Sequence, residues 1–349
     1  MAEKRSLLDR LFGRRPAESV TVHRLELVAG YGSIFSEWAG SPYQADVVRG
    51  AVDAIARNAA RLKPRHIRRA GGAITAVAGQ IERVLAVRPN QHMSTFDFLY
   101  KVVTTLLVEN NAFIYPEWAG GQLVAVWPIS CTRAEFLEQE DGVAYVRFWF
   151  RDGKDRVLPY AELIHLRRHF FRDPLVGDDN SPLDGTLNAI RITNQGIAQA
   201  VQSSANLRGL LKFSAMLKPD DMKKQRDTFV ADYLSVNSSG GVAALDSKAE
   251  YVELKGDPKM VNAAQMKELR DTVYRYFGVN EAIVTSKYTE DDWNAFYESV
   301  LEPLAVQLSL EFTAKLFTGR EQGHGNEIIF ESNRLQYASA TTKLRLLVA

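Results

Sequence analysis

Hydrophobic residues recur at helical spacing in two stretches of the first third of the chain. The stretch 42–62 begins at Pro42, which suits the first turn of a helix. Its apolar positions are Val47, Val48, Ala51, Ile55 and Ala59. The second stretch is 94–109, where Ser94 is expected to cap a helix and the charge of Asp97 suits the helix dipole. Both stretches are predicted to be helices.

A section rich in β-branched and aromatic residues follows. Its expected strands cover 112–118, 122–129, 133–139, 145–150 and 156–160. Turns are predicted at Gly120-Gly121 and at Asp141-Gly142. The section is therefore interpreted as an antiparallel meander. No glycine-rich phosphate loop lies between a strand and a helix, which argues against a nucleotide-binding domain.

The middle of the chain is predicted to hold a long and unusually polar helix, 186–213, about 40 Å in length. Its apolar positions are sparse, so it needs partners on several sides or lines a wet surface. A short charged helix is expected at 218–235, followed by two strands at 241–246 and 249–256. A further helix, 257–277, begins at Asp257-Pro258 and ends at Gly278.

The last third pairs a loop with a strong helix. Residues 278–292 read as loop, and from Trp293 to Leu316 apolar residues repeat at spacings of three and four. Pro303 lies inside this helix, removes a backbone donor and is expected to bend it. A strand is expected at 326–335.

Composition and charge narrow the function. The 349 residues are 46% hydrophobic and 24% charged, as in folded globular proteins. The net charge of +1 argues against a protein whose whole surface binds nucleic acid. The single Cys131 excludes an internal disulfide and a multi-thiolate zinc site. The N-terminus lacks a signal-peptide core, and no apolar run spans a bilayer. The amphipathic residues 1–15 suit either a membrane-surface helix or a docking arm, and we favour the arm.

Positive charge gathers near the N-terminus. The candidate basic patch is Arg57, Arg61, Lys63, Arg65, Arg68 and Arg69. It either attracts phosphates or an acidic partner, or it is a solvated helix face and loop.

No arrangement of residues predicts catalysis or metal binding. His165 and His169 share a face only on a helix, and Glu162 to Leu166 looks extended. A strand followed by a solvated acidic loop with Asp173, Asp178 and Asp179 is the expected structure there. No Gly-x-Ser-x-Gly elbow is present, so we expect no enzyme, no cofactor and no metal.

The order of these elements resembles a portal protein, the head–tail connector ring of tailed bacteriophages, over about residues 40–335. The segments that carry the resemblance are VENNAFIYPEW, WPIS, ELIHLRR, SPLDGTLNAI, GGVAALD and YRYFGVNEAIV. Each is diffuse, and their order and spacing are distinctive. The resemblance implies an α+β ring-forming fold with an antiparallel wing, long stem helices, a small clip and a kinked channel helix.

The resemblance also implies a division of the chain. The expected parts are a wing at 1–185 with an N-terminal arm at 1–20, a first stem helix at 186–213, a clip at 214–255, a second stem helix at 256–277, a channel loop at 278–292, a kinked helix at 293–317, and the wing's return strand and tail at 318–349. The crown helices of many portal proteins are expected to be absent or reduced.

In that family, twelve subunits enclose a channel for double-stranded DNA. The implied partners are identical copies, the large terminase subunit, a head–tail adaptor, and the major capsid and scaffolding proteins, with no membrane. The implied location is the capsid vertex of a virion assembled in the host cytoplasm. The residues expected to face DNA are Thr285, Ser286, Lys287, Tyr288, Thr289 and Glu290. Such a loop is expected to move between fixed supports and to bind phosphates weakly, because tight binding would stall the DNA.

Two alternatives come from other classes. One is a metal-dependent phage nuclease, which would need clustered carboxylates such as Asp178, Asp179 and Asp184, or Glu290 to Asp292. These lie in predicted loops without a strand framework. The other is a structural head-completion adaptor, which is usually shorter and lacks paired long helices.

Overall fold

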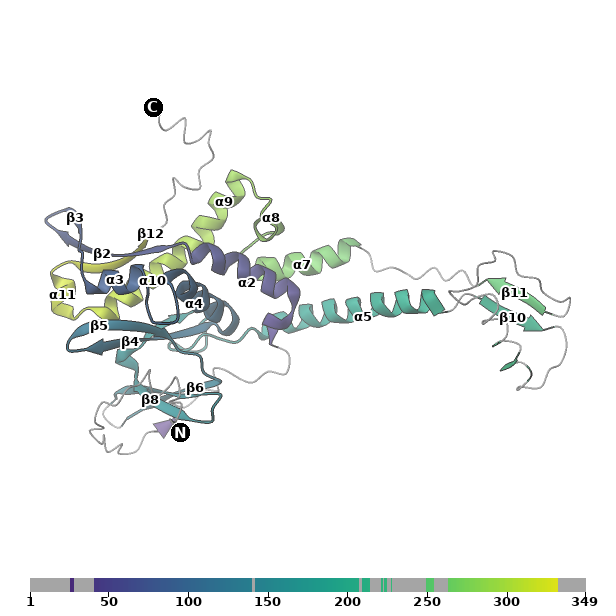
Figure 1. Ribbon diagram of the computed structural model, residues 1–349, viewed down its shortest axis with the longest axis horizontal. Helices are drawn as coiled ribbons and strands as arrows, with labels where there is room; N and C mark the ends of the chain where they lie inside the picture. The colour runs from purple at the N-terminus through teal and green to yellow at the C-terminus, as the bar shows by residue number, and fades with distance from the viewer. Residues whose placement is uncertain are drawn as a thin grey trace, which may run out of the picture. The chain divides into compact units, whose positions relative to one another are not determined.

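The structure is a computed structural model that describes residues 26–27, 41–139, 142–206, 209–213, 221, 223–224, 227, 249–253 and 263–331. The chain forms two compact units. The larger is Met1–Gly185 with Asp271–Ala349, and the smaller is Thr186–Arg270 (Figure 1). The expected N-terminal arm 1–20, most of the expected clip 214–255 and the tail after residue 331 lie outside the described residues.

The first two predicted helices are confirmed in the larger unit. A 3₁₀ turn at Pro42–Gln44 leads into α2 (Asp46–Ala59), and α4 spans Thr95–Glu109. The Ser94 side chain accepts from the Asp97 amide and the Asp97 carboxylate accepts from the Ser94 amide, so a full capping box starts α4. A short helix that the sequence analysis missed, α3 (Gln80–Ala86), precedes it.

The five expected strands all form and pair antiparallel, but they belong to two sheets. They are β4 (Asn111–Ala119), β5 (Gln122–Pro128), β6 (Arg133–Glu138), β7 (Ala144–Trp149) and β8 (Asp155–Pro159). Two more strands join these sheets, β9 (Ile164–Arg167) and the two-residue β1 (Glu26–Leu27). One sheet has the order β5-β4-β9 and the other β1-β6-β7-β8. The single meander is therefore corrected: β4 pairs with β5 on one edge and with the later β9 on the other, so β6 begins a new sheet.

A third sheet of the larger unit has the order β12-β2-β3. Its strands are β2 (Lys63–Ala70), β3 (Ala73–Ala76) and β12 (Asn326–Glu331). The strand expected at 326–335 is thus confirmed over the described residues 326–331, and the first helix ends at Ala59 instead of residue 62. Most of the candidate basic patch lies on β2, which the sequence analysis read as helix face and loop.

Four helical segments lead from the end of α7 (Ala263–Phe277) to β12. They are α8 (Glu281–Val284), α9 (Glu290–Phe296), α10 (Glu302–Leu316) and α11 (Gly319–Gly323). A π-helical turn at Tyr297–Leu301 joins α9 to α10, and the Glu302 amide bonds the Tyr297 carbonyl across it. Pro303 follows at the start of α10, where its missing N–H breaks the α-helical bond pattern. The bend itself stays a prediction.

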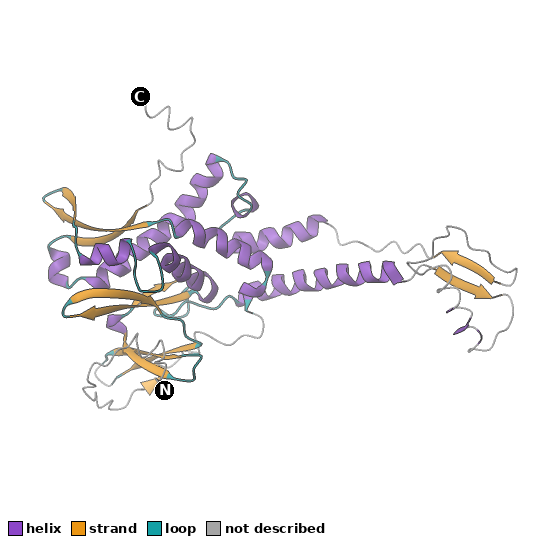
Figure 2. Ribbon diagram, in the orientation of Figure 1, coloured by secondary structure: helices purple, strands orange, loops and turns teal. Residues whose placement is uncertain are grey.

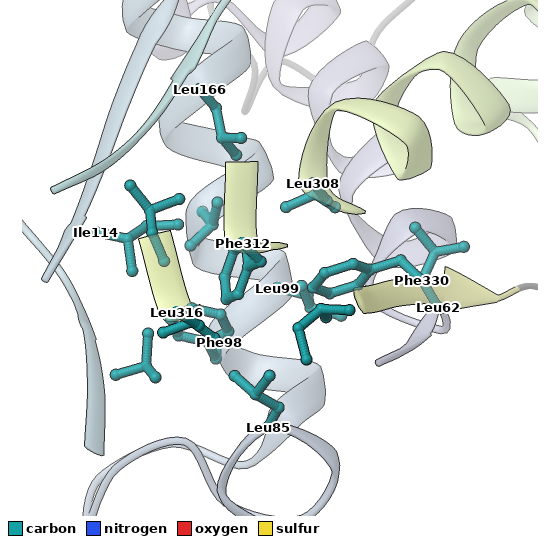
Figure 3. Packing of buried hydrophobic residues seen from close by; sticks show 14 of the residues in the cluster. Leu62, Leu85, Phe98, Leu99, Ile114, Leu166, Leu308, Phe312, Leu316 and Phe330 are labelled. Carbon is teal, nitrogen blue, oxygen red and sulfur yellow. The ribbon is translucent and has the colours of Figure 1, made fainter. Parts of the chain in front are cut away.

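One apolar core fills the space between β12-β2-β3 and β5-β4-β9, where α4 and α10 lie (Figure 2). Leu308 and Phe312 of α10 are fully buried there. Phe98 of α4 and Phe330 of β12 meet the Phe312 ring edge-on, with centroids 6.5 and 5.1 Å away. Figure 3 shows these side chains converging on one cluster. A second cluster, around Phe113, Phe136 and Phe148, joins β4 to β6 and β7.

The smaller unit holds most of the long polar helix. Helix α5 spans Asp184–Asn206, and β10 (Gly209–Phe213) pairs antiparallel with β11 (Ala249–Glu253). The predicted helix 186–213 is therefore too long: its last five residues are a strand, because they find a partner about forty residues later. The strand expected at 249–256 is confirmed over 249–253, and its last residues and the strand expected at 241–246 lie outside the described residues.

Within the described part of the chain, no helix is both long enough and apolar enough to cross a bilayer.

Candidate functional site

The segment 278–292, here called the channel segment, begins with a glycine stop. Gly278 has φ +79°, in the left-handed region, and its amide bonds the Arg275 carbonyl at 3.1 Å. An added Cβ there would lie 3.0 Å from Val300, so only glycine fits without a shift. The sequence prediction that Gly278 ends the preceding helix is confirmed.

The first half of the channel segment is helical, which corrects the expected loop. Asn280 caps α8 by accepting from the Ile283 amide at 2.9 Å. At the other end, Ser286 takes φ +61° and donates to the Ile283 carbonyl, while the Lys287 amide bonds Ala282 at 2.9 Å. This is the bond pattern of a Schellman ending with serine where glycine is usual. A left-handed serine is a strained choice.

The second half ends in a capping box. Thr289 accepts from the Asp292 amide at 3.2 Å and donates its hydroxyl to the Asp292 carboxylate at 2.8 Å. The other carboxylate oxygen accepts from the Asn280 side-chain amide at 3.0 Å, so the starts of α8 and α9 are joined. Hydrogen bonds from the Thr289 amide and hydroxyl and from Asn280 lower the pKa of Asp292. Only Thr285 to Tyr288 and the capping Thr289 lie between the two helices.

Arg57 of α2 attaches the channel segment to the rest of the larger unit. Its Nη2 donates to the Val284 carbonyl and to the Ser286 hydroxyl, both at 3.3 Å, and its Nη1 donates to Asp53 at 2.8 Å. Asp53 also accepts from the Tyr100 hydroxyl at 2.8 Å. Burial and this bond to Asp53 raise the pKa of Tyr100 to about 12, so it stays a donor. A cation at the C-terminal end of α8 also suits the helix dipole.

The channel segment has a small apolar anchor, contrary to the expectation of none. Ile283 and Trp293 are buried, and the ring of Tyr288 lies 5.3 Å from that of Trp293. All six residues expected to face DNA, Thr285 to Glu290, are exposed. Their contact with DNA is not tested by the structure and stays a prediction.

A buried cluster of amides, missed by the sequence analysis, positions the helix that leads into the channel segment. We call Asn110, Asn111 and Asn180 the asparagine cluster. Asn180 accepts from the Tyr276 hydroxyl at 2.7 Å and from the Asn110 amide at 2.9 Å. Its own amide donates to the Val108 carbonyl at the end of α4. Through Tyr276, the last turn of α7, which directly precedes the channel segment, is thereby bonded to the end of α4.

Asn111 holds the loop after β9 against the same junction. Its side chain accepts from the Gly177 amide at 2.9 Å and donates to the Gly177 carbonyl at 3.1 Å. A Cβ at Gly177 would lie 2.3 Å from the Asn110 carbonyl, so no other residue fits there. Three of the segments that carry the resemblance meet here, namely VENN, ELIHLRR and YRYFG, together with Asn180, which precedes SPLD. Their spacing in the sequence gave no sign of this contact.

The two histidines do not form a metal site. His165 is buried on β9, which confirms the extended prediction, and its ring stacks 4.0 Å from Phe113. Its Nε2 lies 3.2 Å from the Asn111 side-chain oxygen, and Tyr160 lies 3.3 Å from Nδ1. Asn111 can only accept there, so Nε2 carries the proton and Nδ1 accepts. Burial holds the pKa of His165 well below its usual range, consistent with a neutral ring.

The carboxylates that the nuclease alternative would need instead accept local backbone hydrogen bonds or stand at the start of a helix. Asp178 accepts from the Phe171 amide and Asp179 from the Ser181 amide. Asp184 lies in the first turn of α5, and Asp292 belongs to the capping box. Among the described residues no group of three metal-ligating side chains gathers. The geometry therefore gives the nuclease alternative no support.

The candidate basic patch is divided among different partners. Arg65 pairs with Glu82 of α3 at 3.1 Å, and Arg69 pairs with Glu327 of β12 at 2.9 Å. Arg68 donates to the His324 carbonyl, and Arg57 serves the channel segment. Arg61 and Lys63 are exposed. Binding of phosphates or of an acidic partner at this patch stays a prediction.

The sequence matches a family model described as "Phage portal protein" over residues 46–348. Two relatives called "Probable portal protein", from Lactococcus phages p2 and SK1, are each 27% identical over 248 residues. The match covers 70% of this chain and 57% of each relative, so the chain spans less than two thirds of their length.

Solved structures share the fold. A chain in the neck of an empty gene transfer agent (GTA) particle computed with C6 symmetry matches with a TM-score of 0.67 at 14% identity, covering 90% of this chain and 88% of that one. A chain from the native GTA neck computed with C12 symmetry gives 0.66 at 13% identity, covering 91% and 90%. A HK97-family portal protein from Corynebacterium diphtheriae gives 0.52 at 16% identity, covering 88% and 99%. With the family model covering most of the sequence, the chain belongs to the phage portal protein family.

Proposed function

We propose that the chain assembles into a homo-oligomeric ring of twelve copies at the vertex of a phage-like particle. The central channel of that ring passes double-stranded DNA during packaging and ejection. The observation that carries the proposal is the family match over residues 46–348, together with a fold shared with a chain from a neck of C12 symmetry. The role is structural, and DNA movement is driven by a separate motor.

The channel segment is proposed to line the bore. Its exposed residues carry the single cation Lys287 and the acidic Glu281, Glu290 and Asp291. Each phosphate that a protein neutralises adds affinity, so a lining with few cations lets DNA slide. The Asn280 cap, the Thr289 capping box and the asparagine cluster give this segment fixed ends, which a moving part between rigid supports requires.

The division of the chain and the partners are part of the same proposal. The expected wing, 1–185 with 318–349, belongs to the larger unit, which also holds the channel segment and the expected kinked helix 293–317. The expected stem and clip include α5 and the β10–β11 pair. We assign the large terminase subunit to the clip side. A head–tail adaptor, the major capsid protein and the scaffolding protein are assigned to the outer surfaces. Assembly is proposed to occur in the host cytoplasm before the ring enters the virion.

The structure sharpens the test of the channel role. Removing 285–290 would also delete Thr289, the cap of α9, and unfold more than the lining. Replacing only Thr285 to Tyr288 by four small residues keeps the cap. We expect ring assembly to stay intact and DNA packaging or retention to be lost.

The matched control replaces four exposed residues elsewhere, 151–154 in the turn between β7 and β8, in the same way. That variant is expected to assemble and to package DNA normally. Normal packaging and retention by the Thr285 to Tyr288 variant would contradict the channel role.

A further inference from the structure

Helix α10 is covered on three sides by its own chain. Its inner side, with Leu308 and Phe312, enters the core. One flank bonds β12, because the Thr313 hydroxyl accepts from the Ile328 amide at 2.9 Å and the Ser309 hydroxyl accepts from the Phe330 amide at 3.0 Å. On the other flank Gln307 donates to the Arg167 carbonyl, at the end of β9, at 2.8 Å.

The fourth side of α10 is apolar, and no described part of the chain covers it. Pro303, Val306, Leu310 and Ala314 follow one another at spacings of three, four and four, so they share one face. At 100° per residue this face lies opposite Leu308 and Phe312. All four are exposed; the exposed fractions of Val306 and Leu310 are 52% and 66%. We call these four residues the outer stripe.

A helix that is apolar on its inner and outer sides is expected to be buried on both. We propose that the outer stripe is a contact between neighbouring subunits, where α10 of one copy packs against the next copy of the same chain. This inference rests on the proposed ring. In a closed ring each subunit meets its neighbour through two different faces, so the stripe need not complement itself.

Other occupants fit the stripe less well. It carries no cationic side chain, so DNA has no phosphate partner there. Four residues are far too few to anchor a membrane-surface helix. The described chain leaves α10 along the β12 flank, where it reaches Glu331, and not across the stripe. A second copy remains as the partner, because the proposed ring places identical copies side by side.

The first test places a charge on the stripe. Leu310→Glu is compared with Val87→Glu, a matched change at the end of α3, where the exposed fraction is 67%. We expect Leu310→Glu to weaken ring assembly at least tenfold in analytical ultracentrifugation or mass photometry, and Val87→Glu to leave it unchanged. The melting temperature of the dissociated subunit should stay the same in both. A Leu310→Glu ring that assembles at wild-type concentrations would overturn the inference.

The second test needs no loss of assembly. In Leu310→Cys, the new thiol is labelled with a maleimide in dilute subunits and in rings. Burial raises the pKa of the native Cys131 thiol to about 12, so it contributes little background. Labelling that is fast in subunits and at least tenfold slower in rings supports the contact.

The remaining outcomes are distinct. Fast labelling in both states would show that nothing covers the stripe. Slow labelling in both states, lifted when residues 332–349 are removed, would show that the chain's own tail covers it. Either result overturns this inference while leaving the ring in place. If the wild-type chain forms no ring at any concentration, the proposed function itself fails.

Discussion

The core around α10 and the channel segment adjoin in the chain and are held in opposite ways. Leu308 and Phe312 are fully buried among apolar side chains from two sheets and from the neighbouring helices. The channel segment buries only Val279 and Ile283, beside Trp293 of α9, and otherwise depends on exposed caps and on Arg57, whose side chain is 36% exposed. Opening the core costs the stability of the whole unit, whereas opening the segment costs only local bonds. This difference suits a moving lining on a fixed support.

The largest effect is expected in the core. Phe312→Ala removes a ring that packs against Phe98 and Phe330 and leaves a cavity. We expect the free energy of unfolding to fall by about 3–5 kcal/mol, measured by chemical denaturation of the dissociated subunit. Leu310→Ala, on the exposed face of the same helix, should change it by less than about 0.5 kcal/mol. Equal losses would show that the inner and outer sides of α10 are not different.

The asparagine cluster comes next, because it joins the two regions. Asn111→Ala leaves the Gly177 amide and the His165 ring without their partner in a buried place. We expect a loss of about 2–3 kcal/mol in unfolding free energy. Faster hydrogen exchange should appear in the loop after β9. A neutral result would mean that water replaces the amide and that Asn111 does not hold the loop after β9 in place.

Glu109, at the end of α4, makes the stability of the larger unit depend on pH. Burial raises the pKa of its carboxyl group from the ordinary 4.5 to about 7. The folded chain therefore keeps a proton that the unfolded chain releases, so this contribution to stability is present at pH 4 and is lost as the pH rises to about 7.

Glu109→Gln removes that loss, because glutamine cannot ionise. At pH 8 we expect the variant to be more stable by about 1–2 kcal/mol, since one unit of pKa is worth about 1.4 kcal/mol and solvent reaches the half-buried group. At pH 4 the two proteins should unfold at the same denaturant concentration. Stabilisation that is equal at both pH values would rule out ionisation as the cause.

The channel segment should show smaller and purely local effects. Thr289→Ala removes the cap of α9 and is expected to lower the free energy of local opening by about 1 kcal/mol. The hydrogen-exchange rate of amides 290–293 should therefore rise about fivefold. Thr289→Ser keeps the hydroxyl and should restore protection. The melting temperature should not move in either variant, and a clear fall would show that the segment unfolds together with the core.

The smallest effect is expected at Arg57. Arg57→Met breaks half-exposed bonds to Val284 and Ser286, which are worth only a fraction of a kcal/mol. Exchange of amides 285–288 should rise about twofold. Arg49→Met, on the same helix but bonded to Tyr43, is the control and should leave these amides unchanged. A large fall in the melting temperature of Arg57→Met would show that Arg57 stabilises the whole larger unit and not only the channel segment.

Local signals made part of this structure predictable from the sequence. The Ser94 cap, the apolar spacing of 94–109 and the Gly278 stop each act within a few residues, so they identified α4 and the end of α7. The aromatic and β-branched runs identified β4 to β8 for the same reason.

Contacts between distant residues explain the parts that were missed. Strand β2 reads as a charged helix end because its partner β12 follows more than 250 residues later. The last residues of the predicted helix 186–213 become β10 through pairing with β11. The asparagine cluster joins residues about 70 and 96 positions apart, and no local pattern signals that meeting.

The channel segment combines both cases. Its exposed polar residues were correctly predicted to lie between helices, but the short α8 and the apolar anchor at Ile283 were not. Four residues are too few to show helical spacing, and the attachment to Arg57 depends on a residue 229 positions from Ser286.

The most direct test of the account is a cryo-EM reconstruction of the purified full-length protein. We predict a closed ring with an open bore, residues 278–292 at its narrowest level, and the core around Phe312 set back from the axis. A compact monomer at every concentration, or a ring that carries residues 278–292 on its outer rim, would contradict it.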